Sequence, residues 1–363
     1  MQQPVVRWKE WFIHDRSINI LRQQADRYSR QERYAPLGKE GQARLKGSRV
    51  LIVGAGALGT GIAETLVRSG VGHLTIVDRD YVEWSNLQRQ QLYVEQDALE
   101  RMPKAMAAEK RLSAINSTVH VEGKVLDVRV DELEELVQHT DLIMDATDNF
   151  DTRLLINDIA QKHRIPWIYG GCVGSYGITY TFMPGETPCL NCLLGEVPLG
   201  GDTCDTSGII PQAVQMVTAN QTAEAMKLLS GNANALRRKL LSFDVWRNEY
   251  ISINVDGAKK QDCPSCGTSA TYPYLSASNL EKTDVLCGRD TVQIRPARLM
   301  NLDLQHTAER LDRLQEGKVE SNPFLVSFTT GVHRMVIFQD GRVLVHGTKD
   351  TAEARTLVHR YFG

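Results

Sequence analysis

Two Cys-x-x-Cys pairs are the residues of this chain whose spacing most strongly indicates a metal site. Cys189 and Cys192 form the first pair, and Cys263 and Cys266 form the second. Four thiolates satisfy the tetrahedral coordination that Zn²⁺ prefers, and a closed four-cysteine set leaves no position for a substrate. We therefore predict a structural zinc site that holds the fold together and takes no part in the chemistry.

A glycine-rich segment indicates a second site, for a nucleotide. The glycines Gly54, Gly56 and Gly59 lie between the apolar run 49–53 and an apolar pattern of helical spacing. Glycines so spaced let the backbone approach phosphates at a helix N-terminus. Asp78 ends the next apolar run, where an acidic residue binds a ribose hydroxyl. The pattern alone serves NAD, FAD and ATP alike.

Polar and basic residues after Asp78 distinguish among these nucleotides. Asn86, Arg89 and Lys104 follow it in the chain. Cations at this place neutralise a triphosphate and a departing pyrophosphate, which hydride transfer does not need. The alternative is that Arg89 and Lys104 are ordinary surface charges. A NAD-dependent oxidoreductase, the distant alternative function, explains the glycines but neither these cations nor the cysteine pairs.

These motifs, taken in order, resemble the ThiF/MoeB family of adenylyltransferases, relatives of the ubiquitin-activating enzymes, over about residues 26–267. The resemblance also rests on residues 27–31, 146–149 and 203–208. It implies a homodimer that uses ATP and Mg²⁺ to adenylate the C-terminal glycine of a small ubiquitin-like (β-grasp) sulfur carrier protein. A cysteine desulfurase or another sulfur donor is a further partner that it implies.

The resemblance also assigns roles to single residues. It implies that Asp78 anchors the ribose and that Arg30 reaches the ATP of the other subunit. It implies that Asp148 binds Mg²⁺, a hard cation that takes one or two carboxylates plus phosphate oxygens. Asp145 is the competing candidate for the metal. The implied phosphate contacts are Asn86, Arg89 and Lys104.

Three cysteines remain outside the metal pairs. Cys204 lies in a polar segment ahead of the helical run 213–229, and a helix N-terminus favours thiolate. The resemblance implies that Cys204 links covalently to the carrier; the alternative is a spare thiol, because adenylation proceeds without it. Cys172 is expected to be a small buried residue, and Cys287 lies outside the matching region.

Alternating apolar runs and helical patterns predict the fold class. They indicate a Rossmann-like, doubly wound and mostly parallel α/β sheet, followed by a small C-terminal α+β domain. The expected strands are 49–53, 73–77, 119–121, 141–145, 292–294, 324–328, 334–338 and 343–346, and the expected helices include 104–115, 130–137, 302–315 and 350–361. The expected domains are an N-terminal extension 1–25, an adenylyltransferase domain 26–270 and a C-terminal domain 283–363. The extension is either a short amphipathic helix or poorly ordered.

Composition excludes several classes of protein. With 363 residues, of which 42% are hydrophobic, the chain can bury the cores of two domains. A net charge of −2 provides no electropositive surface for nucleic acid. No apolar run is long enough to span a membrane, and charges interrupt any signal peptide. Seven cysteines, four of them in metal spacing, indicate a reducing compartment, so we expect a cytoplasmic protein.

The predicted function is adenylation of a ThiS-like carrier for thiamin thiazole synthesis. Segment 203–208 and the C-terminal domain resemble longer bacterial members of that pathway. The alternative substrate is the small subunit of molybdopterin synthase (MoaD-like), because both carriers end in Gly-Gly. A non-catalytic adaptor is disfavoured by the presence of Arg89, Lys104 and Asp148. The C-terminal domain has three possible roles: binding the carrier, binding a sulfur donor, or stabilising a dimer.

Overall fold

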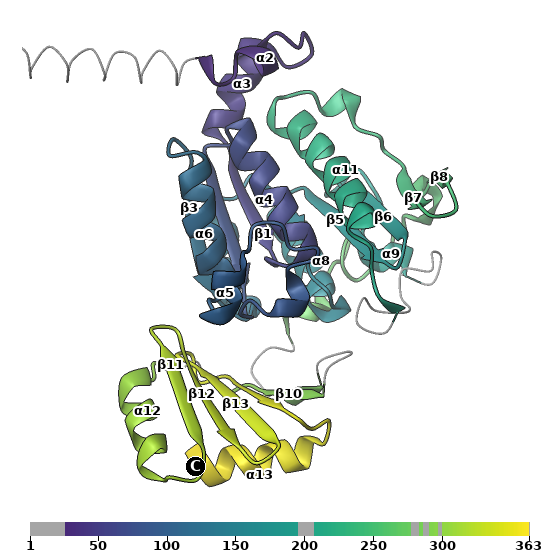
Figure 1. The fold of residues 1–363 in the computed structure, drawn as a ribbon. Helices are drawn as coiled ribbons and strands as arrows, with labels where there is room; N and C mark the ends of the chain where they lie inside the picture. Colours follow the sequence, from purple (N-terminus) through teal and green to yellow (C-terminus); the bar gives the residue numbers. More distant parts are fainter. Residues whose placement is uncertain (1–25, 195–206, 277–282, 286–289, 297–299, 363) are drawn as a thin grey trace, which may run out of the picture.

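The computed structural model describes residues 26–194, 207–276, 283–285, 290–296 and 300–362. They form an N-terminal α/β domain and a separate C-terminal domain built on an antiparallel sheet (Figure 1). The expectations for the extension 1–25, for Cys204 and for Cys287 fall outside the described residues. The domain boundaries expected from the sequence stay a prediction.

The N-terminal domain is built on an eight-stranded sheet of order β3-β2-β1-β4-β5-β6-β7-β8. Its strands are β1 (Arg49–Val53), β2 (His73–Asp78), β3 (His120–Val125), β4 (Leu142–Asp145), β5 (Trp167–Val173), β6 (Tyr176–Phe182), β7 (Leu240–Asp244) and β8 (Glu249–Ile253). Strands β1 to β5 are parallel, which confirms the predicted Rossmann-like sheet. Strands β6 to β8 extend it in antiparallel fashion, and neither they nor β5 were predicted. The short turn between β5 and β6, at Gly174, permits only an antiparallel pair.

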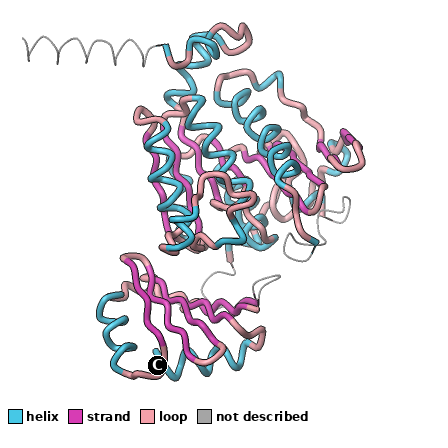
Figure 2. The backbone as a smooth tube through the Cα atoms, viewed as in Figure 1, coloured by secondary structure: helices cyan, strands magenta, loops and turns pink. Residues whose placement is uncertain are grey.

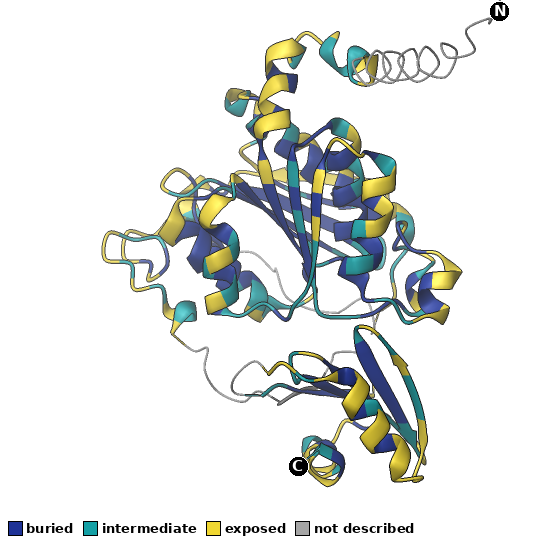
Figure 3. Cartoon of the chain, turned by 90° about the vertical axis from the view of Figure 1, so that its left-hand side faces the viewer, coloured by how far each residue is buried: buried dark blue, intermediate teal, exposed yellow. Residues whose placement is uncertain are grey.

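Helices cover both faces of this sheet (Figure 2). On one face lie α4 (Ala57–Ser69), α6 (Lys104–Ile115) and α11 (Pro211–Leu229); on the other lie α7 (Val130–Leu136) and α8 (Phe150–His163). Successive residues of β1 point to opposite faces, so Ile52 packs in the first core and Leu51 in the second. Figure 3 shows the resulting buried strands between the two helical layers. Short helices are α2 (Ser29–Glu32), α3 (Gly38–Gly47), α5 (Glu95–Leu99), α9 (Leu190–Leu193) and η1 (Trp84–Asn86).

The strand order places the sequence motifs at one edge of the sheet. Strand β1 pairs with β2 on one side and with β4 on the other, all parallel. The chain therefore reverses its direction of strand addition at β1, the topological switch point where such sheets bind ligands. Gly54, Asp78 and Asp145 follow or end these three neighbouring strands. They consequently meet at the carboxyl edge.

The C-terminal domain has a six-stranded antiparallel sheet of order β11-β12-β13-β14-β10-β9. Its elements are β9 (Thr283–Val285), β10 (Thr291–Ile294), α12 (Leu304–Arg313), β11 (Lys318–Asn322), β12 (Leu325–Thr330), β13 (His333–Phe338), β14 (Val343–His346) and α13 (Thr351–Phe362). The two helices pack with one face of the sheet around a core that includes Leu311 and Phe328. The predicted α+β domain is confirmed; β9 and β11 were not predicted. No helix in the described part of the chain is long and apolar enough to cross a membrane.

Candidate nucleotide site and metal centre

The turn from β1 to α4 requires glycine at two positions. Gly54 has φ +102°, and a Cβ on it would lie 2.4 Å from the carbonyl oxygen of Ala146. A Cβ on Gly59 would lie 1.9 Å from the carbonyl oxygen of Gly54. Gly56 caps α4, whose first N–H groups therefore face the turn. This close packing leaves an anion-binding helix end at the carboxyl edge of the sheet.

Gly59→Ala is expected to weaken ATP binding at least tenfold, because its methyl group must displace the Gly54 carbonyl and reshape the turn. Titration calorimetry with ATP measures the dissociation constant. Gly47→Ala is the matched control, since a Cβ at Gly47 meets nothing within 4 Å. A folded Gly59→Ala chain that binds ATP as the parent does would contradict this role of the turn.

Asp78 supports the glycine turn from the neighbouring strand. Its carboxylate accepts hydrogen bonds from the N–H of Ala55 at 2.6 Å and of Asp80 at 2.7 Å. Burial raises the pKa of Asp78, and the charge of Lys104 opposes that shift. The Nζ atom of Lys104, a buried side chain, lies 3.2 Å from a carboxylate oxygen of Asp80. The structure thus brings together the predicted residues Asp78 and Lys104.

Tyr93 joins the glycine turn to the start of α6. Its buried hydroxyl donates to the carbonyl of Ala55 at 2.6 Å and lies 3.1 Å from that of Lys104. The sequence reasoning missed both Tyr93 and Asp80. A possible signal for Asp80 was its place two residues after Asp78, whereas nothing in the local pattern distinguishes Tyr93 from a core aromatic.

Asn86, the last residue of η1, presents a buried amide. Its side chain is 0% exposed, and its Oδ1 accepts a hydrogen bond from the N–H of Glu83 at 3.1 Å. Its Nδ2 has no partner among the described residues, and the same holds for Oε1 of the buried Gln90. An unpaired buried amide group costs about 1–3 kcal/mol, which a bound ligand can offset. These two orphaned groups fit a polar ligand such as a nucleotide.

Arg89 lies at the rim of this region. It is half-buried, and its Nη1 donates to the carbonyl of Ser85 at 2.9 Å. It lines a groove of about 480 Å³ between α4 and α11. Arg89 thus has its guanidinium next to open space and is available to a ligand or a second chain.

The two acidic residues at the end of β4 and just after it differ in their surroundings. Asp145 is 0% exposed; it accepts from the N–H and hydroxyl of Thr147 and pairs with Nε of Arg153 at 3.0 Å. Arg153 also donates to the carbonyls of Thr147 and Gly170. Asp148 is exposed and accepts one long hydrogen bond, 3.5 Å, from Asn149. Asp145 therefore stabilises the loop that follows β4, whereas Asp148 is accessible to a cation.

Arg79 shows that the acidic residues of the edge lie near one another. Burial by itself would lower the pKa of Arg79, but neighbouring carboxylates outweigh it and raise the pKa. In order of effect they belong to Asp127, Asp80, Asp148 and Asp78. Asp148 thus shares one electrostatic environment with Asp78, although they follow different strands. Such a mixture of carboxylates and cations suits a nucleotide with a bound divalent cation.

The four paired cysteines converge on one centre. Their sulfurs all lie within 4.8 Å of one another, and three of the separations are 3.5, 3.6 and 3.8 Å. A tetrahedral ZnS₄ site with bonds of about 2.3 Å has sulfur separations of about 3.8 Å. Cys189 and Cys192 lie at α9, while Cys263 and Cys266 come from a loop after β8. The donor set therefore fits a tetrahedral metal ion.

Neighbouring polar groups hold the cysteine cluster in place. The N–H of Leu190 donates to Asn157 on α8 at 2.8 Å, and Asn191 donates to the buried hydroxyl of Ser265 at 3.1 Å. The pKa of Cys266 is lowered to about 5, chiefly by a hydrogen bond with Cys189. Hydrogen bonding within the cluster thus favours the charged form of one of the four thiols.

Arg30 lies away from the nucleotide site of its own chain. It belongs to α2, and its side chain is 77% exposed. The neighbouring Gln31 fastens α2 to the carbonyl of Ser69, at the C-terminal end of α4. The glycine turn lies at the other end of this 13-residue helix, about 20 Å away at 1.5 Å per residue. An arginine side chain cannot span that distance.

The remaining cysteine in the described region differs from its expectation. Cys172, at the end of β5, is half-buried and packs against the first core without being enclosed by it. The cause is its place next to the Gly174 turn, where the strand leaves the sheet. Cys204 lies outside the described residues, although the chain just after it, at Gly208, pairs with Gly174.

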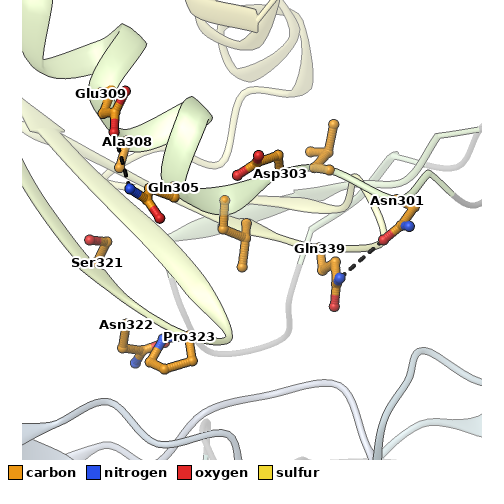
Figure 4. Close-up of a pocket in the computed structure, with 11 residues that line it drawn as sticks. Asn301, Asp303, Gln305, Ala308, Glu309, Ser321, Asn322, Pro323 and Gln339 are labelled. Carbon is orange, nitrogen blue, oxygen red and sulfur yellow. Dashed lines mark hydrogen bonds between the residues drawn. The ribbon is translucent and has the colours of Figure 1, made fainter.

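A separate cavity of about 800 Å³ lies in the C-terminal domain (Figure 4). Its lining includes Asp303, Glu309, Asn301 and Gln339, the last two joined by a hydrogen bond of 3.0 Å. The lining residues that the structure describes include carboxylates and amides but no Lys, Arg or His. Carboxylates in such a lining repel phosphates, so this cavity is not a candidate for the nucleotide site.

Comparison with known proteins identifies relatives along most of the chain. A sequence model of the ThiF family matches residues 28–265. The sulfur carrier protein ThiS adenylyltransferase of Bacillus subtilis (strain 168) is 52% identical over 93% of this chain and 99% of its own length. The SAMP-activating enzyme E1 of Haloferax volcanii is 39% identical over 69% of this chain and 92% of its own. A structure of Escherichia coli MccB with MccA-N7isoASN has TM-score 0.58 at 23% identity, covers 67% of this chain and 74% of its own, and shows the fold alone.

Proposed function

The chain belongs to the ThiF family, and we propose that it adenylates the C-terminal glycine of a ThiS-like sulfur carrier protein with ATP. The observation that carries this proposal is the similarity to the Bacillus ThiS adenylyltransferase, which extends over 93% of the chain and so includes the C-terminal domain. By contrast, the similarity to the Haloferax relative covers only 69% of this chain. The cations and carboxylates at the carboxyl edge of the sheet support this proposal, because the reaction needs groups that hold ATP and offset its charge.

The reaction joins a carrier carboxylate oxygen to the α-phosphorus of ATP. The bond from that phosphorus to the bridging oxygen breaks, and pyrophosphate leaves with the electron pair. Asp78 holds the ribose, while Lys104 and Arg89 offset the charge of the phosphates. The carrier carboxylate is already ionised, so no general base is required, and catalysis consists of positioning and charge stabilisation.

Asp148 is the residue that we assign to Mg²⁺. Its exposure and its single long hydrogen bond leave its oxygens accessible, whereas both oxygens of Asp145 already have partners. When bound, Mg²⁺ would neutralise phosphate charge. This chain would contribute one carboxylate to it, in keeping with the few protein ligands that Mg²⁺ takes.

The cysteine centre is assigned to structural Zn²⁺, held by Cys189, Cys192, Cys263 and Cys266. A cluster of reduced thiols also supports a cytoplasmic location. For Cys204 we keep the proposal that it links covalently to the carrier, with a sulfur donor such as a cysteine desulfurase as the third partner.

We propose a homodimer because Arg30 cannot reach the nucleotide site of its own chain. The distance along α4 places it away from the glycine turn, and its guanidinium, which contacts the adjacent Ser29 and Asp26, is exposed and accessible to a partner chain. A cation supplied in this way would act on the triphosphate, as an arginine finger does.

Mixing Arg30→Ala chains with Lys104→Ala chains is expected to restore activity that neither variant has alone. Each mixed dimer has one site with both cations intact, so about a quarter of the parent activity should return on random pairing. Carrier-dependent exchange of pyrophosphate into ATP measures it. Verified mixed dimers that stay inactive would show that Arg30 acts within its own chain.

The proposed function is tested by the same exchange reaction with two carriers. A ThiS-like and a MoaD-like protein, each with an intact Gly-Gly end, are offered side by side with ATP and Mg²⁺. We expect exchange that requires the ThiS-like carrier and is lost when its last glycine is removed. Exchange with the MoaD-like carrier alone would change the substrate, and exchange with neither carrier, despite ATP binding, would overturn the proposal.

A further inference from the structure

The C-terminal domain contacts the N-terminal domain beside the nucleotide site. Figure 1 shows it at one end of the large sheet, next to α5. Hydrogen bonds and ion pairs join the two domains at segments 79–83, 100–101 and 127–129. The first segment follows Asp78, the second precedes Lys104, and the third follows β3. The docked surface is therefore built from loops that flank the nucleotide site.

Tyr81 is the centre of this contact. It is 4% exposed and packs among Leu325, Val336, Phe338 and Leu344 of the C-terminal sheet. Its position in an apolar cluster of the other domain indicates that docking buries it.

The hydroxyl of Tyr81 is held by two side chains of the C-terminal domain. It accepts a hydrogen bond from Nη2 of Arg334 at 2.9 Å, and it lies 3.0 Å from Nε2 of His346. Because the hydroxyl accepts from Arg334, its proton is available for His346, whose Nδ1 lies 2.9 Å from the hydroxyl of Thr291. Arg334 also lies 3.8 Å from a carboxylate oxygen of Glu83.

Asp127, which follows β3, forms a second contact with the C-terminal domain. Its carboxylate pairs with Arg79 at 3.3 Å within its own domain and with Arg295 of the C-terminal domain. Gln293 donates to the same carboxylate at 3.3 Å. Arg79 lies between Asp78 and Asp80. The contacts of Asp127 therefore hold the same segment, 79–83, as the contacts of the C-terminal domain with Tyr81.

Hydrogen bonds of the backbone connect segment 79–83 to Asp78 and Lys104. The N–H of Val82 donates to the carbonyl of Met102 at 2.8 Å, and that of Lys104 donates to the carbonyl of Asp80 at 2.9 Å. The N–H of Asp80 in turn donates to the carboxylate of Asp78. Displacement of Tyr81 would therefore move the residues on both sides of it, including the start of α6.

We propose that the C-terminal domain positions the ATP site, with Arg334 and His346 as positioning residues that act through Tyr81 on Asp78 and Lys104. This rests on the proposed function only in that the nucleotide is ATP. Because docking and nucleotide binding use one segment, they are coupled, and each strengthens the other by the same factor. Coupled sites commonly change affinity by about 5- to 150-fold.

The test compares two double variants in the full-length chain. Arg334→Ala/His346→Ala is expected to raise the ATP dissociation constant and the KM for ATP at least fivefold, with the KM for the carrier changed less than twofold. Arg334→Lys/His346→Gln keeps a donor and a hydrogen-bonding amide for Tyr81 and should recover most of the affinity. Arg360→Ala, which removes an ion pair with Glu316 on α13, is the control and should leave ATP binding unchanged.

Unaltered ATP affinity in the folded alanine variant would overturn the proposal, as would equal rises in both KM values. If that variant does not fold, hydrogen exchange of the parent protein decides. ATP should slow amide exchange at least threefold in 333–338 and 343–346 but not in α13, and no slowing there would overturn the proposal. Failure of the parent itself to bind ATP would instead refute the proposed function.

Discussion

Asp148→Ala is expected to reduce carrier-dependent ATP–pyrophosphate exchange by about 100- to 1,000-fold, the loss typical of removing one preorganised electrostatic group. The physical reason is the loss of the carboxylate that we assign to Mg²⁺, next to a triphosphate. The fold should be unaffected, because the side chain is exposed and accepts only one long hydrogen bond. Exchange rates and thermal unfolding of the same sample measure the two effects.

Asp145→Ala provides the contrast. It would leave the buried guanidinium of Arg153 without its carboxylate, and breaking such a pair costs about 3–5 kcal/mol. We therefore expect a lower unfolding temperature from Asp145→Ala and a normal one from Asp148→Ala. Retained exchange in Asp148→Ala would move the Mg²⁺ role to another residue.

Cys263→Ser is expected to abolish stoichiometric zinc and to lower the unfolding temperature by at least 10 °C. Structural Zn²⁺ in small sites contributes apparent binding energies of about 10–16 kcal/mol at pH 7, so loss of one of four thiolates removes much of it. The loop that carries Cys263 and Cys266 and the short helix α9 are joined across 74 residues by this centre. Metal analysis and thermal unfolding measure both outcomes.

Cys172→Ser is the matched control, because Cys172 is a half-buried cysteine outside the cluster. It should keep one zinc per chain and nearly the parent stability. A Cys263→Ser protein with full zinc content, or one that loses zinc without losing stability, would contradict a structural metal.

Strands β1 to β4 of the parallel sheet were predictable because their signals are local. The apolar run before Gly54 and the helical pattern after Gly59 predict the strand and helix that the structure shows. Strand β5 and the antiparallel strands β6 to β8 were not predicted. Strand β8 is exposed along its whole length, so it has no buried apolar pattern to identify it.

The sequence alone did not determine which of two acidic residues, Asp145 or Asp148, is accessible to a metal. Both are acidic, Asp145 ends β4 and Asp148 follows three residues later, and this spacing does not show which of them binds the metal. The structure separates them because Arg153 and Thr147 occupy Asp145. Tyr93 was missed for a related reason: its hydroxyl joins two carbonyls whose residues are far apart in the chain.

The sequence by itself determined the chemistry that is possible here, because glycine turns, paired cysteines and acidic strand ends depend on residue type and short spacing. Tertiary structure alone decided which groups meet. It brought the two cysteine pairs together, placed Arg30 at the far end of α4 from the glycine turn, and set Tyr81 against the C-terminal sheet. Those contacts join residues up to 265 positions apart, and chain packing, which local periodicity does not encode, produces them.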